Sequence, residues 1–244
     1  MNPTVRPAKS RPDAFTLIEL LTVMLIISIL ASMILASLVT AKEKAKRTTC
    51  RNNLHQLMLG IHLYGGDYND KLPRGTTDGD EEYPPLIPTN TWKSFIKYGG
   101  SDRIVGCPGL AAPFRLGGYA WPDHGYVFGY IYLGGHEKLR DPLQAARLKW
   151  VPPATINDGN TQPVIVDLNV WSPPAVQTVV PHGNRGSVAI GDATNPDSGG
   201  IPCRALGAAG GNAGYLDGSA SWKPINKMDD YPISLLDNEI WGNW

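Results

Sequence analysis

The start of the chain pairs a polar segment with a long uninterrupted apolar one. Residues 1–13 are polar and include Arg6, Lys9 and Arg11, with Asp13 as the one acid. The stretch Leu20–Ala41 then contains no charged residue, no proline and no glycine. It is roughly 22 residues long, enough for a helix to cross the hydrocarbon core of a bilayer. The pattern therefore predicts one membrane-spanning helix.

Beyond a charged cluster that begins at Lys42, the apolar positions fall on one helical face. This spacing is typical of a helix that packs one side on a soluble domain. Because Gly65 and Gly66 form a natural stop, we expect one helix from Phe15 to Tyr64, roughly 75 Å long. The apolar stripe consists of Cys50, Leu54, Leu57, Met58, Ile61 and Tyr64.

The rest of the chain favours short strands separated by turns. Most of its 27 glycines and 21 prolines lie after residue 64, and both residues interrupt regular elements. Asp217-Gly218 predicts a hairpin with a two-residue type I′ turn. The expected fold is α+β, a long N-terminal helix packed on a small antiparallel sheet. The predicted strands are Gly125–Leu133, Pro163–Asp167, Ser187–Ile190 and Gly214–Trp222, with a short helix at Leu139–Leu148 and an edge-covering segment at Asp229–Trp244.

Charge and length narrow the function classes. Basic and acidic residues number 22 each, so the formal net charge is zero. A nucleic-acid binder usually carries a basic excess, and we therefore expect no nucleic-acid partner. The 244 residues suit one domain, or one domain with a tail.

The apolar segment allows two interpretations. It could be a secretory signal peptide that is removed, or a permanent single span. The apolar run is longer than the usual 7–15 residue core of a signal peptide, and its end at Ser37–Lys42 is a poor cleavage site. The amphipathic pattern also continues beyond it, which favours the permanent span.

Glu19 is the residue that distinguishes this span from others. An acidic side chain in a bilayer costs about 2.5–3.5 kcal/mol near the centre and less near the interface. A charged partner would lower that cost. A cut between Ala14 and Phe15 would create such a partner, because the new α-amino group of Phe15 could meet Glu19 of its own helix or of a neighbouring subunit. The alternative is an interfacial glutamate without a special role.

The string Phe15–Leu21 (FTLIELL), after a basic leader and before an apolar stretch, resembles the class III signal of type IV prepilins and type II secretion pseudopilins. The resemblance implies that a prepilin peptidase cuts before Phe15 and methylates its amine, and that Glu19 pairs with the N-terminus of an adjacent subunit. The chain departs from the family at Ala14, where the family usually has glycine.

The resemblance implies a complete organisation for the protein. Residues 1–14 would be a cytoplasmic leader, 15–41 the transmembrane half of the helix, 42–64 its amphipathic periplasmic half, and 65–244 a periplasmic Gly/Pro-rich β domain. The protein would be a single-pass protein of the cytoplasmic (inner) membrane and a subunit of a type II secretion pseudopilus or a type IV pilus-like filament. Its partners would be other pilin or pseudopilin subunits, the prepilin peptidase, the inner-membrane assembly platform and membrane lipid.

A second resemblance runs patchily through the rest of the chain. The segment from Cys50 to Pro73 is similar to pseudopilin-like proteins of planctomycetes and verrucomicrobia. In those proteins a Cys-Pro step follows, here Cys107-Pro108, and a His-Gly element precedes a glycine-rich C-terminal segment. His182-Gly183 and Gly210–Trp222 would be the matching elements.

The three cysteines, Cys50, Cys107 and Cys203, show no CxxC or Cys/His zinc spacing. If the domain is exported, one disulfide and one leftover thiol are expected. A Cys50–Cys107 bridge would connect the helix to the domain. Three ordinary buried or free cysteines are the alternative.

A calcium site is the one cofactor that the sequence suggests. Asp192, Asn195 and Asp197 offer hard oxygen ligands close together, which suits Ca²⁺. Major pseudopilins, which the chain resembles, carry a calcium site in a C-terminal loop. A solvated turn rich in Asp and Asn is the alternative, and no other cofactor is expected.

Catalytic motifs are missing, so we expect no enzyme. The P-loop, the Rossmann fingerprint and Gly-x-Ser-x-Gly do not occur. His55 and His62 are interpreted as solvated helix residues. The alternative function is a membrane-anchored envelope module that binds glycan or protein and does not polymerise. Its contact residues would be Trp121, Tyr126 and Tyr130, although core packing also accounts for them.

Overall fold

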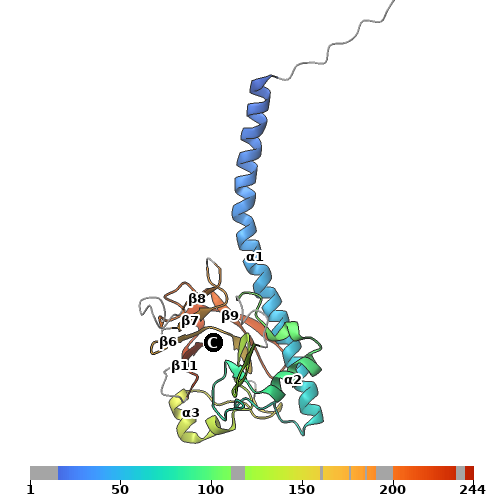
Figure 1. Cartoon of the computed structure of the whole chain (residues 1–244), viewed down its shortest axis with the longest axis vertical. Helices are drawn as coiled ribbons and strands as arrows, with labels where there is room; N and C mark the ends of the chain where they lie inside the picture. Colours follow the sequence, from blue (N-terminus) through green and yellow to red (C-terminus); the bar gives the residue numbers. More distant parts are fainter. Residues whose placement is uncertain are drawn as a thin grey trace, which may run out of the picture. The chain divides into compact units, whose positions relative to one another are not determined.

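The computed structural model describes residues 16–110, 119–159, 162–175, 177–184, 186–190, 200–234 and 240–244. The chain divides into two compact units at Lys42 and Glu43. We call them the N-terminal unit and the C-terminal unit. Helix α1, Leu17–Asp67, contributes to both (Figure 1).

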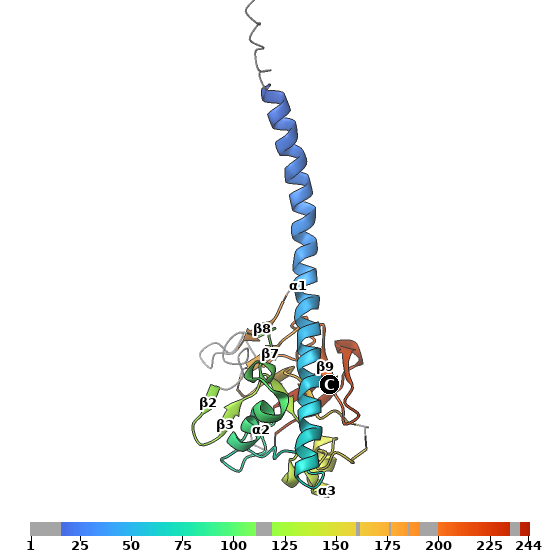
Figure 2. The same ribbon diagram turned by 90° about the vertical axis from the view of Figure 1, so that its right-hand side faces the viewer.

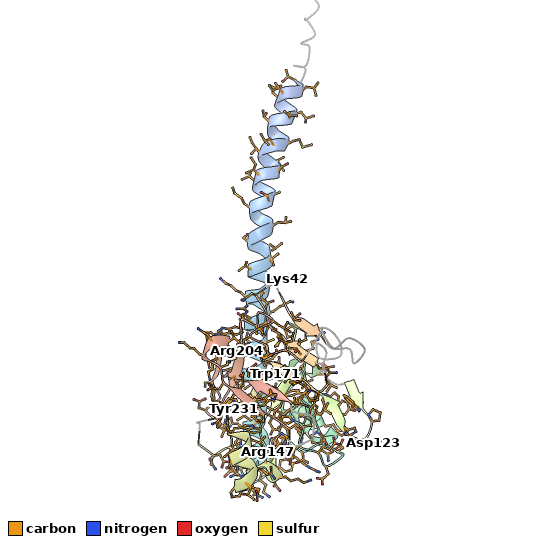
Figure 3. The ribbon with its side chains drawn as sticks, turned by 90° about the vertical axis from the view of Figure 1, so that its left-hand side faces the viewer. Lys42, Asp123, Arg147, Trp171, Arg204 and Tyr231 are labelled. Atoms are coloured by element: carbon orange, nitrogen blue, oxygen red, sulfur yellow. The ribbon has the colours of Figure 1, made fainter. Side chains whose placement is uncertain are left out.

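The described part of the N-terminal unit is the first half of α1. None of its most apolar window is buried, and its apolar side chains project on all sides up to Lys42 (Figure 3). By length and composition it is able to cross a membrane. The hydroxyl groups of Thr22, Ser28, Ser32 and Ser37 donate back to helix carbonyls at 2.7–3.0 Å. These four hydroxyl groups therefore need no other partner in an apolar environment.

Besides the second half of α1, the described part of the C-terminal unit contains three antiparallel sheets, two short helices and 3₁₀ turns. The sheet orders are β1-β3-β2, β10-β9-β5-β4 and β11-β12-β6-β7-β8. The expected α+β fold, a long helix packed against antiparallel sheets, is confirmed, with three sheets in place of one. The strands are β1 Leu86–Ile87, β2 Tyr119–Trp121, β3 Gly125–Val127, β4 Tyr130–Tyr132, β5 Ile165–Asp167, β6 Val170–Ser172, β7 Gln177–Val180, β8 Val188–Ile190, β9 Gly210–Gly214, β10 Ala220–Pro224, β11 Asp230–Pro232 and β12 Trp241–Asn243; the helices are α2 Thr89–Gly99 and α3 Pro142–Leu148.

The second half of α1 lies against the four-stranded sheet. The predicted stripe is buried, with Cys50, Leu54, Leu57, Met58 and Ile61 at 0% exposure. The helix packs closely on the sheet because the last residue of β9 is Gly214. A Cβ atom at Gly214 would lie 3.1 Å from the Met58 side chain. The burial of this stripe places α1 at the centre of the hydrophobic core.

Two histidines of α1 bind the loop between β9 and β10. A ring nitrogen of His55 lies 2.7 Å from the carbonyl oxygen of Gly218, and one of His62 lies 2.6 Å from that of Leu216. Each ring donates an N–H to a backbone carbonyl of the hairpin loop. Both residues had been interpreted as solvated helix residues; His55 is exposed and His62 is half-buried, and each also bonds to the hairpin loop.

Helix α2 was missed in the sequence, although its amphipathic pattern is clear in the structure. It buries Thr91 and Phe95 and ends at Gly100, which has a left-handed φ of 82°. Figure 2 shows α2 beside the lower part of α1. A Cβ atom at Gly60 of α1 would lie 3.1 Å from the backbone nitrogen of Gly99. The missing side chain at Gly60 is what lets the two helices approach.

Several predicted elements are divided in the structure. The run 125–133 forms two strands in different sheets, with a break at Gly129. The run 139–148 forms a 3₁₀ turn and then α3, because Asp141 caps α3 with bonds to two backbone N–H groups and Pro142 occupies its first turn. Helix α1 also continues through Gly65 and Gly66 to Asp67.

The C-terminal hairpin is present, but its turn differs from the prediction. The backbone N–H of Tyr215 donates to Ser219, and that of Gly218 donates to Tyr215. Of the loop residues, Gly218 alone has a positive φ, 80°, which fits a three-residue loop and not a two-residue type I′ turn. The last segment joins the five-stranded sheet as β11 and β12 and does not cover its edge.

The stripe on α1 predicts a difference between its two faces. Leu57→Ala should lower the free energy of unfolding by about 2–5 kcal/mol, because it opens a cavity in the core. Leu63→Ala is the matched control, since its side chain is 60% exposed, and it should change stability by about 0.5 kcal/mol or less. Denaturant unfolding of the detergent-solubilised chain measures both. Equal losses would contradict the assignment of the buried face.

Candidate functional site

Glu19 lies in the first turn of α1, and its carboxylate folds back toward the start of the helix. One oxygen, Oε2, accepts from the backbone N–H of Thr16 at 2.8 Å and from its hydroxyl at 2.7 Å. The N–H of Glu19 in turn donates to the Thr16 hydroxyl at 3.3 Å. This reciprocal pair is a capping box. Ala14 and Phe15 lie outside the described residues, but Thr16 directly follows them, so the carboxylate points to the end of the chain where an N-terminal amine would be created.

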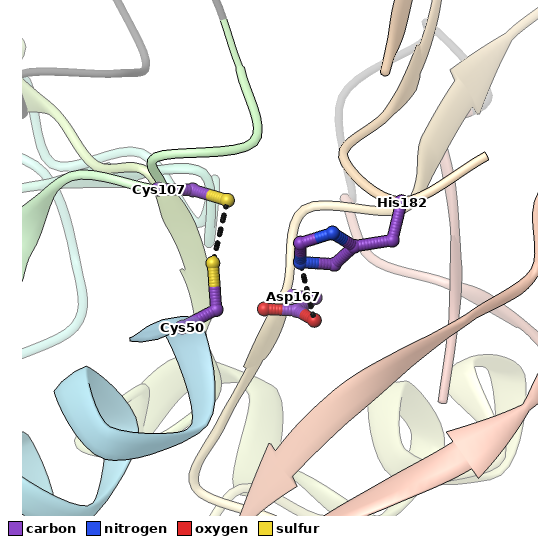
Figure 4. Close-up of side chains that lie close together, drawn as sticks. All are labelled: Cys50, Cys107, Asp167 and His182. Carbon is purple, nitrogen blue, oxygen red and sulfur yellow. Dashed lines mark hydrogen bonds and ion pairs between the residues drawn. The ribbon is translucent and has the colours of Figure 1, made fainter. Parts of the chain in front are cut away.

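A second constellation is buried in the C-terminal unit, where Cys50, Cys107, Asp167 and His182 meet. They come from α1, the segment after the 3₁₀ turn at 102–105, the end of β5 and the segment after β7. All four are buried, with at most 1% exposure. The two sulfur atoms are 3.0 Å apart (Figure 4). One ligand atom from each residue lies within 4.8 Å of the others, close enough to hold one metal ion.

His182 is oriented by residues of α1. Its Nδ1 lies 3.0 Å from Oε1 of Glu43, so an N–H there donates to the carboxylate. Arg47 lies 3.5 Å from the same oxygen and stacks 4.5 Å from the ring centre of Trp222. The Trp222 ring meets the His182 ring edge-on. These contacts fix the imidazole with Nε2 directed at the cluster.

Asp167 is held on one side only. Its Oδ2 accepts from the backbone N–H of Asn212 at 2.6 Å and from the Asn212 side chain at 2.9 Å. The same oxygen lies 3.5 Å from Nε2 of His182. The other oxygen, Oδ1, and Nε2 of His182 are buried and have no hydrogen-bond partner among the residues that the structure describes. Buried polar atoms are normally paired, so both atoms need an explanation.

The cluster shifts the pKa values of its members. Burial raises the pKa of Asp167 to about 7. Burial disfavours a charged His182, but Cys107, Asp167 and Glu43 outweigh it and raise the His182 pKa to about 8. Contact with the Cys50 sulfur lowers the pKa of the Cys107 thiol to about 5, and contact with Cys107 raises the pKa of Cys50.

The predicted site residues have different outcomes. Cys50 and Cys107 are brought together as free thiols, and their disulfide stays a prediction. Cys203 is buried elsewhere, against Val180 and Ala208. The predicted calcium ligands, Asp192, Asn195 and Asp197, lie outside the described residues, so that prediction is untested.

The aromatic residues considered for glycan binding are mostly core residues. Tyr130 is fully buried, and Tyr126 stacks on Trp92 with ring centres 4.3 Å apart. Trp121 is 51% exposed. It borders a cavity of about 330 Å³ with His124 and Trp171. Trp121 therefore remains available for a contact, and Tyr130 does not.

Two family models match the chain. Residues 9–35 match the prokaryotic N-terminal methylation motif, and residues 39–94 match a family described as "Protein of unknown function (DUF1559)". The chain carries a prepilin-like class III signal. This signal joined to a DUF1559 segment is typical of planctomycete pseudopilin-like proteins. No curated protein and no solved structure matches the chain significantly.

The prepilin-like signal fixes the coarse function. It is the signal of pilin-like proteins that a prepilin peptidase processes. Together with the apolar first half of α1, it is consistent with a membrane-anchored protein exposed in the cell envelope. Glu19 lies inside the matched motif, and Cys50 lies inside the DUF1559 segment.

Sequence reasoning missed the partners of the buried cluster. Asp167 was read only as the end of a buried strand, and Glu43 only as part of a charged cluster. An acidic residue that closes the apolar run Val164–Asp167 is a signal in itself, because carboxylates are rarely buried without a partner. Its meeting with His182 depends on strand pairing that no local pattern contains.

The orientation of His182 predicts a specific loss of stability. Glu43→Ala leaves the buried Nδ1–H of His182 without its acceptor, which should cost about 1–3 kcal/mol. Lys44→Ala, on the exposed side of the same turn, should leave stability nearly unchanged. Thermal and denaturant unfolding compare the two. A loss for Lys44→Ala as large as for Glu43→Ala would contradict the role given to the carboxylate.

Proposed function

We propose that this protein is a subunit of a type II secretion pseudopilus or a type IV pilus-like filament. In this proposal it is cut between Ala14 and Phe15, methylated on the new amine, and assembled through the first half of α1. The observation that carries the proposal is the combination, in one exposed apolar helix, of a single acid at the start and no charge for the rest of the span.

The position of Glu19 supports assembly over simple anchoring. An anchor gains nothing from an acid in its apolar segment, since the charge opposes insertion. A filament gains a defined register, because the carboxylate can pair with a neighbouring N-terminus only when the two subunits are offset correctly. The capping bonds to Thr16 already hold the carboxylate at the N-terminal end of α1.

The same proposal sets the topology in the membrane. The basic leader would stay in the cytoplasm, and the C-terminal unit would be translocated to the periplasmic side. The further partners would be other pilin-like subunits, the inner-membrane assembly platform and lipid around the apolar helix half. We further propose that the protein has no enzymatic activity.

A membrane-anchored binding module is the second candidate. It is supported by the cavity of about 330 Å³ that is lined by the exposed Trp121, by His124 and Trp171, and by Glu81 and Gln177. Aromatic rings beside polar groups are suited to sugar or peptide ligands. Such a module would not need Glu19 for its function.

The Glu19 side chain decides between these two candidates. Glu19→Leu should insert into the membrane at least as well as the native chain but should yield no sheared filaments. Thr22→Ala is the matched control, since it removes a neutral hydroxyl one turn further along, and it should still assemble. Electron microscopy of sheared material and membrane fractionation give the two readouts. Filaments that persist in Glu19→Leu would overturn the role proposed for Glu19 in assembly. A native chain that inserts into the membrane but yields no filaments would overturn the proposed filament and favour the binding module.

A further inference from the structure

The buried cluster of the C-terminal unit is not explained by filament assembly. It brings two thiols, a carboxylate and an imidazole together in the core. Carboxylates are rarely fully buried unless they are paired. We propose that Cys50, Cys107, Asp167 and His182 form a closed structural site for one Zn²⁺ ion. The inference is independent of whether the protein polymerises.

The unpaired atoms at the centre of the cluster are the first argument. Nε2 of His182 and Oδ1 of Asp167 are both buried and make no hydrogen bond among the described residues, although Nε2 lies 3.5 Å from Oδ2 of Asp167. In Figure 4 the His182 ring and the Asp167 carboxylate face the two sulfur atoms across a common centre. A cation at that centre would satisfy both orphaned atoms and both sulfurs at once.

The outer contacts of the ligands are the second argument. A zinc-bound histidine usually donates its other ring N–H to a carboxylate, which fixes the tautomer and the ring orientation. His182 does this through Nδ1 and Glu43, at 3.0 Å. Asp167 has the same arrangement, since Oδ2 is held by Asn212 and Oδ1 is left free. Both of these ligands are held by outer contacts and have a free atom on the side of the cluster.

The donor set selects the metal. Thiolate and imidazole donors suit zinc, and a set of four protein donors is typical of a structural zinc site with no open position. Calcium and magnesium prefer oxygen donors. Zn–S bonds of about 2.3 Å in a tetrahedron place two sulfurs about 3.8 Å apart, so the present 3.0 Å separation has to widen by less than 1 Å.

Local backbone features make the close approach of these ligands feasible. A Cβ atom at Gly109 would lie 3.1 Å from the His182 ring and 3.3 Å from the Cys107 sulfur, and 2.6 Å from the carbonyl oxygen of Pro181. The glycine after the Cys107-Pro108 step therefore leaves room for His182 beside Cys107. A side chain at this position would push the imidazole away.

A Cys50–Cys107 disulfide is the competing use of the same residues. It would form one S–S bond with loss of two electrons and two protons to a thiol oxidant. It would involve two of the four donor atoms and would leave Nε2 of His182 and Oδ1 of Asp167 without partners. The zinc site accounts for all four atoms, and it would join the second half of α1 to three segments that are distant in sequence.

Metal content tests the proposal directly. The full chain, purified in detergent with a non-chelating reductant, should contain about one equivalent of zinc by elemental mass spectrometry. Cys107→Ser and His182→Ala should lose it, with circular dichroism checking that each variant is folded. Cys203→Ser removes a buried cysteine outside the cluster and should retain the ion. Glu43→Gln should weaken Zn²⁺ binding about 10- to 100-fold in a competition titration with a chelator.

A measurement on the native sequence does not depend on the variants folding. Replacing zinc with Co²⁺ should give the thiolate-to-cobalt charge-transfer absorption and the intense visible bands of a tetrahedral site. A chain that takes up neither Zn²⁺ nor Co²⁺ after reduction would overturn the proposal. Zinc retained in both Cys107→Ser and His182→Ala would also overturn it, as adventitious binding. A Cys50–Cys107 disulfide in a non-reducing peptide map of protein from native membranes would assign the cluster to a covalent bridge instead.

Discussion

Helix α1 has to bury apolar side chains in two different surroundings, and the rest of the structure follows from this constraint. Its first half is apolar around the whole circumference and exposed, and it needs lipid or other apolar helices. Its second half is apolar along one stripe, which the rest of the C-terminal unit buries from Cys50 to Ile61. The uncharged run ends at Ala41, and Lys42 is the last residue of the N-terminal unit.

The second half of α1 is held to the C-terminal unit by polar contacts as well as by its apolar stripe. His55 and His62 bind the loop of the β9–β10 hairpin, and Glu43 binds His182. Such contacts resist sliding or rotation of the helix, which apolar packing alone permits more easily. In the proposed filament, these contacts would keep the domain in a fixed orientation on the second half of its helix.

The parts of this account that depend on local sequence could be predicted. The uncharged run, the acid at Glu19 and the stripe from Cys50 to Ile61 are visible as spacing and residue type. The structure confirms one long helix through the uncharged run and the burial of the stripe. The sequence also predicted that Cys50 and Cys107 lie close together, as they do. Whether the two thiols form a disulfide could not be predicted from the sequence.

The parts that depend on long-range pairing could not be predicted. The segment Gly125–Leu133 reads as one strand, yet Gly129 sends its two halves to different sheets. Asp167 and His182 are brought together by strands β5 and β7, which belong to different sheets, so no spacing in the sequence reveals their meeting. Helix α2 is a different case, because its pattern of Trp92, Phe95 and Ile96 was present in the sequence and was overlooked.

The N-terminal peptide of protein from native membranes tests the central claim most directly. Mass spectrometry of this peptide shows where the chain has been cut and what the new amine carries. The account predicts a mature chain that begins at Phe15 and is heavier by one methyl group. A chain that keeps residues 1–14 would show that the peptidase does not accept Ala14, and a chain cut near Ala41 would show an exported protein without a helical anchor; either result would contradict the account.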